Sequence, residues 1–290
     1  MINDISIWVD DGDLLIYTAE DAISTKKSWV RSVDPVISAG KWYHIAGTRE
    51  SGTLKLYLNG KEIGGDNSNQ NIARNITNAN PLILGKNTGG YHLDGKLDEF
   101  RVWSDVRSVT EIRENMMRTL NGTESNLVAY YSFDEVDGTK LYDISGTHHG
   151  TLTNMAGDEW VDSEAFNTWL GVEFTAWGTA GNWSDGLPDA SENVGIYKRN
   201  LGYESTIGTA SLDNLCITQS SSPTLSSNFS IDGNLILGSD LNLNGQTIDL
   251  GGTGYLIEEP GRIFGTTGKI TTTRNLSNLS SENVAGLGAE

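Results

Sequence analysis

The sequence predicts an all-β protein in two parts, a β-sandwich followed by a repetitive segment of short strands. Three observations carry this prediction. Short apolar segments with alternating polarity recur at roughly 10-residue spacing over residues 1–105, bounded by turn residues. The pair Asn59-Gly60, which favours a hairpin turn, directly follows one of these segments. Beyond residue 200 the chain becomes poor in charge and rich in Ser, Thr, Asn and Gly.

The first part reads as strands joined by tight turns. Leu54, Leu56 and Leu58 alternate with polar or aromatic residues, which is the period of a half-buried strand. Asn59-Gly60 then predicts a type I′ turn, and residues 61–64 form the returning strand of the hairpin. Residues 82–84 form a further strand. Strands at this spacing without helices between them are typical of a sandwich or barrel.

One helix interrupts the strands and begins near Ser108. Ser108 and Glu111 have the spacing of a capping box, in which each side chain bonds a backbone N–H of the first turn. The helix is expected to end at Asn121-Gly122, where glycine supplies the left-handed cap. An apolar stripe follows the helical period, at Ile112, Met116 and Leu120. We expect the helix to pack as a lid on the edge of the sandwich.

The segment 127–133 predicts another apolar strand after the helix. It either closes the first sandwich or begins a second, degenerate copy of it. We expect the first arrangement, in which Tyr130, Tyr131 and Phe133 pair with the first sandwich.

The second part is predicted to be a β-solenoid or an antiparallel meander. Residues 201–290 contain 9 Asp or Glu and 3 Lys or Arg residues. Short apolar pairs recur there, such as Leu235 with Leu237, separated by glycine-rich corners that suit stacked solenoid rungs. Asn244-Gly245 is equally suited to a hairpin, so the meander stays open. We place the domain boundary between residues 168 and 169, giving domains 1–168 and 169–290.

Composition narrows the classes of partner. The chain of 290 residues has a net charge of −18, which repels nucleic-acid phosphates and offers carboxylates to hard cations such as Ca²⁺. Cys216 is the only cysteine, so the chain cannot form an internal disulfide. No apolar run is long enough to span a bilayer. The N-terminus lacks the pattern of a signal peptide, and we expect the sequence to be a fragment with any export signal upstream.

Three segments in this order carry a resemblance to a known family. They are residues 40–48 (GKWYHIAGT), 54–61 (LKLYLNGK) and 93–103 (LDGKLDEFRVW). Residues 5–115 resemble the C-terminal two thirds of a laminin-G-like jelly roll, of the concanavalin A-like lectin and glucanase superfamily. The expected first strands of that jelly roll would precede Met1. Residues 177–290 resemble a repetitive segment of bacterial surface proteins exported by the type IX route, on residues 182–186, 193–196, 261–268 and 283–288.

The resemblance implies a non-enzymatic binding or adhesion module that is secreted or held at the cell surface. The implied partner is a polysaccharide or glycoprotein, and the module would be part of a larger multidomain protein. The alternative is a structural spacer that displays a domain outside this sequence. A glycoside hydrolase is disfavoured, because the glucanases of this fold carry Glu-x-Asp-x-x-Glu on one strand and the sequence has no such match. We therefore expect no catalytic residues.

Asp98 is the sharpest candidate site residue. Alternation places it on one face with Phe100 and Val102, where a bare carboxylate needs hydrogen-bond donors or a cation. We favour a structural hydrogen bond, and the alternative is a weak Ca²⁺ site shared with Asp94. The opposite face holds Glu99 and Arg101, which we expect to form a surface ion pair of little energetic weight.

Two loops supply the remaining candidates. Asp66 and Asn67 lie in a loop rich in oxygen ligands, which could complete a Ca²⁺ site, although a plain turn is the favoured interpretation. Tyr91 and His92 follow two glycines, in a loop from which an aromatic ring could stack on a sugar.

Overall fold

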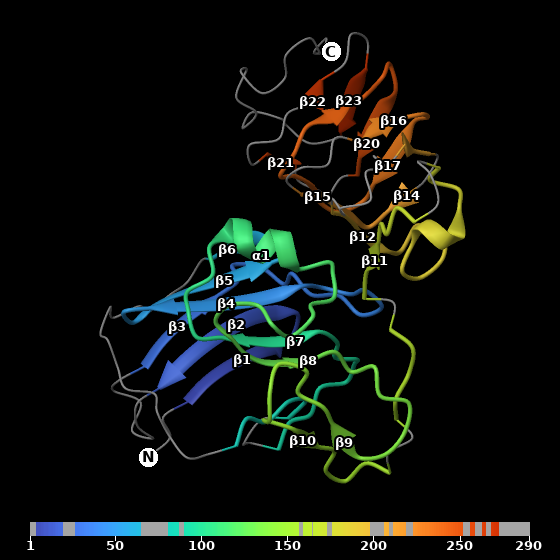
Figure 1. The fold of residues 1–290 in the computed structure, drawn as a ribbon. Coiled ribbons are helices and arrows are strands. Elements are labelled where there is room, and N and C mark those ends of the chain that lie inside the picture. The colour runs from blue at the N-terminus through green and yellow to red at the C-terminus, as the bar shows by residue number, and fades with distance from the viewer. Residues whose placement is uncertain are drawn as a thin grey trace. The chain divides into compact units, whose positions relative to one another are not determined.

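A computed structural model shows a chain built almost entirely of short strands, in two compact units (Figure 1). The sandwich unit comprises Met1–Val109 and Thr119–Ser163, and the solenoid unit comprises Thr110–Arg118 and Glu164–Glu290. The structure describes residues 4–19, 27–64, 81–86, 90–156, 159–163, 165–172, 176–197, 206–208, 211–218, 223–251, 256–258, 263–264 and 268–272. None of the helices in these ranges is long and apolar enough to cross a membrane.

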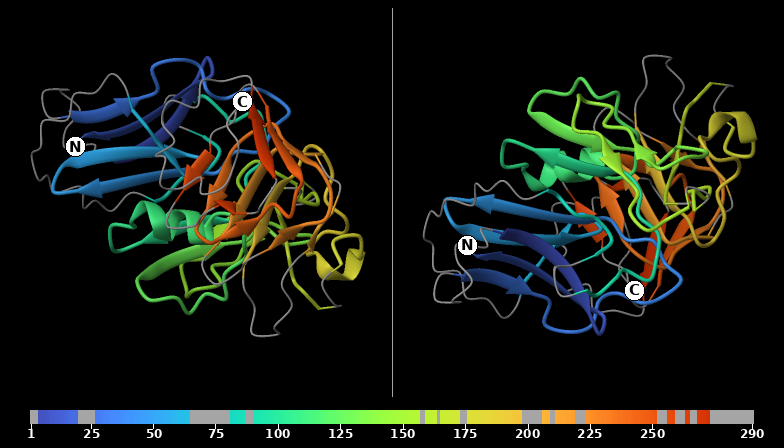
Figure 2. Two further views of the ribbon diagram at one scale, coloured as in Figure 1. Left: turned by 90° about the horizontal axis from the view of Figure 1, so that it is seen from above. Right: turned by 90° about the horizontal axis from the view of Figure 1, so that it is seen from below.

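The sandwich unit is built on two three-stranded antiparallel sheets. The first has the order β1-β2-β3 and the second β4-β5-β6. Figure 2 shows them as two neighbouring layers, the first in darker and the second in lighter blue. Their strands are β1 (Asp4–Asp10), β2 (Asp13–Ala19), β3 (Lys27–Arg31), β4 (Ile45–Glu50), β5 (Thr53–Leu58) and β6 (Lys61–Ile63).

The core between these sheets follows from alternation along the strands. Leu14 and Ile16 of β2 and Leu54 and Leu56 of β5 are at most 2% exposed and form one cluster with Val30. A Cβ atom at position 47 would meet the Cδ1 atom of Ile16, so Gly47 of β4 leaves room for the Ile16 side chain between the layers. The β5–β6 hairpin confirms the predicted turn, because Asn59 and Gly60 have φ angles of 44° and 71°.

Two further pairs of strands belong to the sandwich unit. Strand β8 (Leu127–Tyr131) pairs antiparallel with β7 (Phe100–Trp103), which confirms that the chain returns to this unit after the helix. Tyr131 and Ala129 of β8 form a further core with Leu141, and Phe133 packs against it. Leu141 belongs to β9 (Lys140–Leu141), which pairs with β10 (Gly150–Thr151).

The helix is shorter than the sequence predicts. Helix α1 (Val109–Asn115) ends before the expected Asn121-Gly122 cap, and the Asn115 side-chain amide bonds the Glu111 carbonyl at 2.7 Å. The Glu111 carbonyl is the acceptor that the Asn115 backbone N–H uses in a regular helix, so this side-chain bond competes with the last helical hydrogen bond. Met116 and Met117, just beyond the helix, are buried among Tyr197, Cys216 and Ile236 of the solenoid unit. These side chains therefore do not form the predicted contact with the edge of the sandwich.

The solenoid unit is a stack of parallel strands rather than an antiparallel meander. Three sheets run along it, in the orders β11-β12-β15-β18-β21, β13-β16-β19-β22 and β14-β17-β20-β23, and every pairing within them is parallel. The first sheet is formed by β11 (Asn167–Thr168), β12 (Asn193–Ile196), β15 (Asn214–Ile217), β18 (Leu235–Leu237) and β21 (Leu256–Glu258). The second is formed by β13 (Thr206–Ile207), β16 (Thr224–Leu225), β19 (Leu241–Asn242) and β22 (Ile263–Phe264), and the third by β14 (Ser211–Leu212), β17 (Phe229–Ile231), β20 (Thr247–Leu250) and β23 (Lys269–Thr272).

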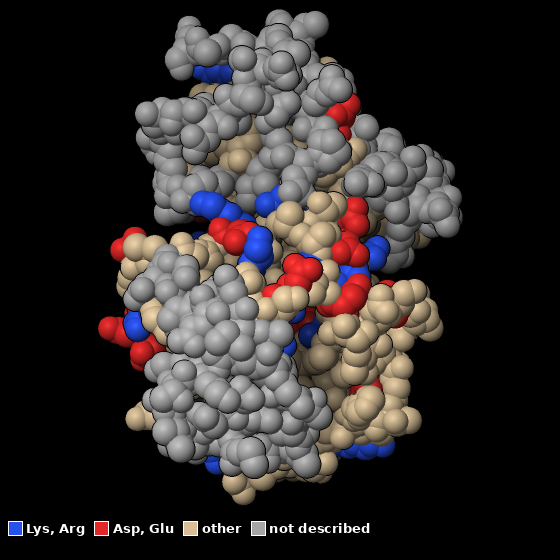
Figure 3. Space-filling view, turned by 90° about the vertical axis from the view of Figure 1, so that its left-hand side faces the viewer, with Lys and Arg blue, Asp and Glu red and all other residues tan. Residues whose placement is uncertain are grey.

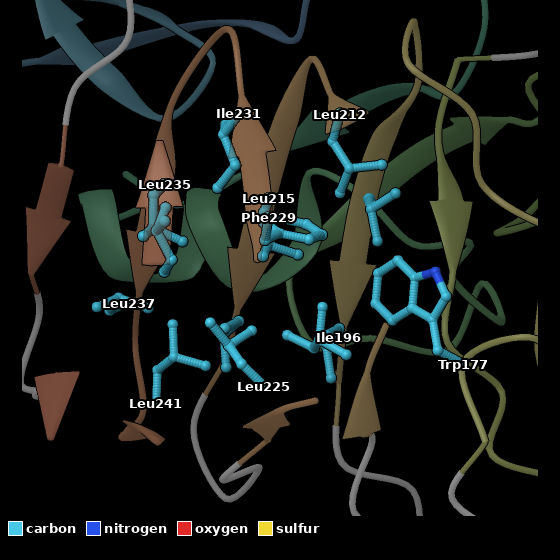
Figure 4. Close-up of a cluster of buried hydrophobic side chains, with 14 of the residues drawn as sticks. Trp177, Ile196, Leu212, Leu215, Leu225, Phe229, Ile231, Leu235, Leu237 and Leu241 are labelled. Carbon is cyan, nitrogen blue, oxygen red and sulfur yellow. The ribbon is translucent and has the colours of Figure 1, made fainter. Parts of the chain in front are cut away.

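The rungs bury one continuous core. Side chains from all three sheets point toward one another in the interior, as Figure 4 shows for Leu212, Leu225 and Leu237. Three tryptophans join this core near the short 3-10 helix η1 (Ala180–Asn182). The Trp183 ring contacts the other two edge to face, with its centroid 4.5 Å from that of Trp177 and 5.0 Å from that of Trp169. Each rung buries its apolar face on its neighbours, which is the arrangement that a solenoid requires.

Buried asparagines link successive rungs. The Asn214 side-chain amide donates to Asn193 Oδ1 at 2.6 Å, and Asn214 Oδ1 accepts from the Asn234 backbone N–H at the same distance. Asn193 in turn donates to the Ala165 carbonyl at 2.9 Å. These bonds satisfy side-chain polar groups that would otherwise be buried without partners.

We predict that the solenoid core is sensitive to a single truncation. Leu215 is 0% exposed, and Leu215→Ala should lower the free energy of unfolding of the solenoid unit by about 2–5 kcal/mol. Leu187 in the same unit is 51% exposed, and Leu187→Ala makes the same chemical change with an expected cost below about 0.5 kcal/mol. Urea unfolding of both variants measures the difference. Equal midpoints would contradict the core assigned to Leu215.

Candidate functional site

The predicted site residues 91–101 lead into strand β7, and the pairing of β7 with β8 positions the charged ones. Arg101 lies directly opposite Tyr130, and Phe100 lies opposite Tyr131. Side chains that are directly opposite share a face. Phe100 and Tyr131 therefore face the second core of the sandwich unit, while Arg101 and Tyr130 face the other way.

Glu99, Arg101 and Tyr130 form one hydrogen-bonded cluster. Arg101 forms an ion pair with Glu99 Oε2. The Tyr130 hydroxyl donates to the Glu99 carboxylate, at 2.8 Å from Oε1 and 3.0 Å from Oε2, and accepts the Leu120 backbone N–H at 3.2 Å. The Arg101 guanidinium also lies 5.4 Å from the centre of the Tyr130 ring.

The Glu99–Arg101 pair is not the surface ion pair that the sequence predicts. The side chains are only 10% and 9% exposed. Alternation correctly put the two residues together, but it could not show that Tyr130, 31 residues further along, covers them. Removing one partner of a buried ion pair is strongly destabilising, because it leaves an uncompensated charge in the interior.

Burial sets the protonation of this cluster. It raises the pKa of Glu99 from 4.5 to about 7, against the opposing charge and hydrogen bond of Arg101. Burial also raises the pKa of Tyr130, and the nearby Glu99 charge adds to the effect. The hydroxyl therefore stays protonated and acts as a donor to Glu99.

The charge of Arg101 in this cluster also affects His44. Burial, with a further contribution from the charge of Arg101, lowers the pKa of His44 from 6.5 to about 3. Its backbone N–H donates to Asn59 Oδ1 at 2.9 Å, and its carbonyl accepts the Asn59 N–H at 2.8 Å. Its Nδ1 atom is buried and has no hydrogen-bond partner among the described residues. His44 is thus a neutral residue that anchors the β5–β6 turn through its backbone.

The pKa of Glu99 resembles that of an acid–base catalyst, but the burial of its side chain does not suit contact with a substrate. A carboxyl group with a pKa near 7 suits general acid catalysis at neutral pH. Glycoside hydrolysis also needs a second carboxyl group on the other side of the scissile bond and room for the sugar between them. Both Glu99 oxygens instead accept the Tyr130 hydroxyl, and the side chain is only 10% exposed.

Asp98 is held by protein donors. Its Oδ1 accepts the Glu99 backbone N–H at 2.9 Å, and its Oδ2 accepts the Ser163 hydroxyl. Burial raises the pKa of Asp98, and the charge of Asp134 raises it further. A carboxylate with a raised pKa whose two oxygens already accept hydrogen bonds fits a cation poorly.

Calcium binding by Asp94, Asp98, Asp66 and Asn67 stays a prediction. No group of three or more His, Cys, Asp or Glu side chains among the described residues is arranged to hold a metal ion. Asp94 is exposed on the approach to Asp98. Asp66 and Asn67 lie outside the described residues.

Tyr91 and His92 lie in a loop that pairs with itself. His92 forms a β-bridge with Lys86, and the Leu93 N–H donates to the Gly85 carbonyl at 2.8 Å. Tyr91, at the turn, is 77% exposed. That exposure suits a residue that contacts a ligand, and the role of Tyr91 and His92 in binding stays a prediction.

Asp143 is an organising residue that sequence reasoning missed. Its carboxylate accepts the backbone N–H groups of Tyr130, Ser145 and His148, each at 3.0 Å, and the Ser145 hydroxyl at 2.7 Å. Burial alone would raise the pKa of Asp143, but these hydrogen bonds lower it to about 2. The Asp-x-Ser spacing, which is typical of an Asx turn, is the signal that could have found it.

The comparison with family models supports the fold of the sandwich unit. Residues 2–113 match the Laminin_G_3 model, described as the concanavalin A-like lectin/glucanases superfamily. The match spans strands β1–β7 and agrees with a jelly-roll sandwich for this part of the chain. Comparisons with curated proteins and with solved structures found no match. A superfamily of lectins and glucanases is compatible with carbohydrate binding, with or without catalysis.

We predict an unusual pH dependence of stability from His44 and Glu99. Between about pH 4.5 and 6.5 the unfolded state binds a proton at His44 that the folded state lacks, and the folded state binds a proton at Glu99 that the unfolded state lacks. The contribution of Glu99 is full below pH 4.5 and is lost as the pH rises through 7. That of His44 is full above pH 6.5 and is lost as the pH decreases toward 3. The two slopes therefore oppose each other.

Glu99→Gln should remove one of these slopes. Relative to wild type, its free energy of unfolding should then decrease as the pH is lowered from 6.5 to 4.5, by at most about 1.4 kcal/mol per pH unit. Chemical denaturation at several pH values measures this. Glu62→Gln alters a carboxylate whose side chain is 52% exposed, and it should leave the slope unchanged. Parallel curves for Glu99→Gln and wild type would show that Glu99 does not titrate as described.

We predict that Asp98 acts as a hydrogen-bond acceptor rather than a calcium ligand. Asp98→Asn should lower thermal stability, since the Ser163 and Glu99 donors lose a charged partner, whether or not calcium is present. Calorimetric titration with millimolar CaCl₂ should give the same heat for the variant as for wild type. A saturable heat that Asp98→Asn abolishes would make Asp98 a ligand.

Proposed function

We propose that the sandwich unit is a non-catalytic carbohydrate-binding module, which recognises a polysaccharide or the glycans of a glycoprotein. The observation that carries the proposal is the match of residues 2–113 to the lectin and glucanase superfamily, on a unit whose two layered sheets agree with a jelly roll. We further propose that the module is secreted or exposed at the cell surface, as part of a larger protein. The extracellular setting of many laminin-G-like domains supports this.

The arrangement of the buried charges favours binding over hydrolysis. Glu99 has the most suitable pKa for acid catalysis, but Tyr130 and Arg101 engage its carboxylate in the interior. Asp98 is likewise engaged by Ser163 and the chain itself. These carboxylates stabilise the junction before β7, and that structural use leaves them poorly placed to reach a glycosidic bond.

Charge favours an uncharged glycan. The net charge of −18 repels polymers rich in carboxylate, sulfate or phosphate. On the face drawn in Figure 3, the described acidic and basic side chains lie interspersed rather than in one basic patch. This supports a neutral polysaccharide and argues against nucleic acid.

A second role, as a spacer, is favoured for the solenoid unit. Its parallel rungs repeat the same contacts along one direction, and its buried core consists mainly of leucine, isoleucine and tryptophan, with Val194 and Phe229. We propose that this unit holds the carbohydrate-binding module away from whatever lies beyond it in the full protein. The resemblance to type IX-exported surface proteins agrees with that role, although residues 283–288 and most of 261–268 lie outside the described residues.

We predict that the intact chain binds at least one neutral polysaccharide and releases no sugar from it. Affinity electrophoresis against a panel of soluble glucans, mannans and xylans should show a retarded band. A reducing-sugar assay on the same polymers should show no release above that of the heat-denatured protein. Retardation by none of the neutral or charged glycans tested would contradict the binding function, and reducing-end release that Glu99→Gln abolishes would make the protein an enzyme.

A further inference from the structure

The outward face of the first sheet carries one large aromatic side chain from each of its three strands. Across β1 and β2, Ile7 lies opposite the fully buried Ile16. Residues next to these point to the opposite side of the sheet. The outward side therefore bears Trp8 of β1, Tyr17 of β2 and Trp29 of β3.

The three residues are neighbours in the sheet. Tyr17 is directly opposite Trp29 in the pairing of β2 with β3. The Trp8 and Tyr17 rings have centroids 6.3 Å apart and planes that differ by 33°. Because the planes are closer to parallel than to perpendicular, the rings together offer a broad apolar surface rather than a locked edge-to-face pair. Figure 1 shows β1 and β2 side by side in this sheet.

This surface is not used by the cores of the protein. None of the buried hydrophobic clusters among the described residues includes Trp8, Tyr17 or Trp29. Trp8 is 41% exposed. Three adjacent aromatic residues outside the core point to a binding surface, because a stable sandwich needs only its inner face to be apolar.

An ion pair between Arg31 and Asp13 lies on the same face of the sheet as the rings. Arg31 follows Trp29 by two residues, so it shares the outward face, and its guanidinium pairs with Asp13 of β2. The Arg31 side chain is 41% exposed, although Asp13 holds it in place. The pair places planar donors and acceptors at the end of the aromatic row while its two charges cancel.

We propose that this face binds an uncharged β-linked polysaccharide, and this inference rests on the proposed carbohydrate-binding function. Sugars joined by equatorial β-linkages form a flat ribbon with apolar C–H faces, which can stack on Trp8, Tyr17 and Trp29 across the three strands. The Arg31–Asp13 pair then bonds the hydroxyl groups at the edge of the ribbon. The acidity of the whole chain disfavours an anionic polymer in the same place.

The test compares variants of the full chain on a soluble β-1,4-glucan, with an α-linked glucan as the contrasting probe. Wild type should be retarded by the β-glucan and not by the α-glucan, and its tryptophan emission should shift on binding. Trp8→Ala should weaken binding about tenfold, since the loss of one aromatic stacking contact is worth roughly 1.4 kcal/mol.

Two controls separate the possible failures. Tyr91→Ala removes the exposed aromatic ring of the candidate loop, so this variant tests the loop as the rival binding site. Trp29→Ala alters a less exposed position, so its circular dichroism and melting temperature must match those of wild type before its affinity is compared. Arg31→Gln tests the polar edge in a fold that retains all three rings.

Three outcomes would overturn the inference. Binding lost in Tyr91→Ala but kept in Trp8→Ala and Trp29→Ala would move the site to the loop, while the carbohydrate-binding function stands. Binding only to α-linked or charged glycans would also spare the function but refute the ligand class. A concentration-dependent dimer in sedimentation, abolished by Trp8→Ala, would make a second copy of the chain the occupant of this face.

Discussion

The antiparallel pairing of β7 with β8 is the interaction on which the second half of the sandwich unit depends. Through Tyr130 it brings together groups that are far apart in the sequence. The hydroxyl of this residue bonds Glu99 and the Leu120 N–H, and its backbone N–H bonds Asp143. The loop before β7, the chain leaving the helix and the turn at Asp143 are therefore fixed by one side chain and its strand. The low exposure of Glu99 and Arg101 and the raised pKa of Glu99 follow from the same pairing.

Local turn chemistry was predictable, but the topology around a turn was not. Asn59-Gly60 and Asn244-Gly245 are the same dipeptide, and both pairs have positive φ angles in the structure. The first joins β5 to β6 in a hairpin, whereas the second lies between β19 and β20, which belong to different parallel sheets. The sequence therefore left a solenoid and a meander open. The choice depends on whether the following strand pairs with its predecessor or with a strand about twenty residues earlier.

The candidate site shows the same division between local and distant information. Alternation correctly paired Glu99 with Arg101, because both residues lie within one short segment. Their burial depends on Tyr130, which no pattern of nearby residues reveals. The aromatic face of the first sheet was hidden for a related reason. Trp8, Tyr17 and Trp29 are nine and twelve residues apart, and only the strand register shows that they share one surface.

The helix shows a further limit of predicting structure from an apolar stripe in the sequence. Ile112, Met116 and Leu120 have the spacing of one helical face, but the helix ends at Asn115. The burial of Met116 was predicted correctly, while its partners Tyr197 and Cys216 lie far along the chain in the solenoid unit. A continuous stripe thus indicated burial more reliably than it indicated the length of the helix or the surface that covers it.

The repeat length of the solenoid has an evolutionary consequence. On its first sheet Asn193 pairs with Asn214, Leu215 with Leu235 and Leu235 with Leu256, so one turn of the coil takes 20 or 21 residues. A duplication of that length would add a complete layer whose asparagine and leucine side chains already match those above and below. A gene that encodes such a coil can therefore grow or shrink in steps, and the lineage can adjust its reach without redesigning any contact.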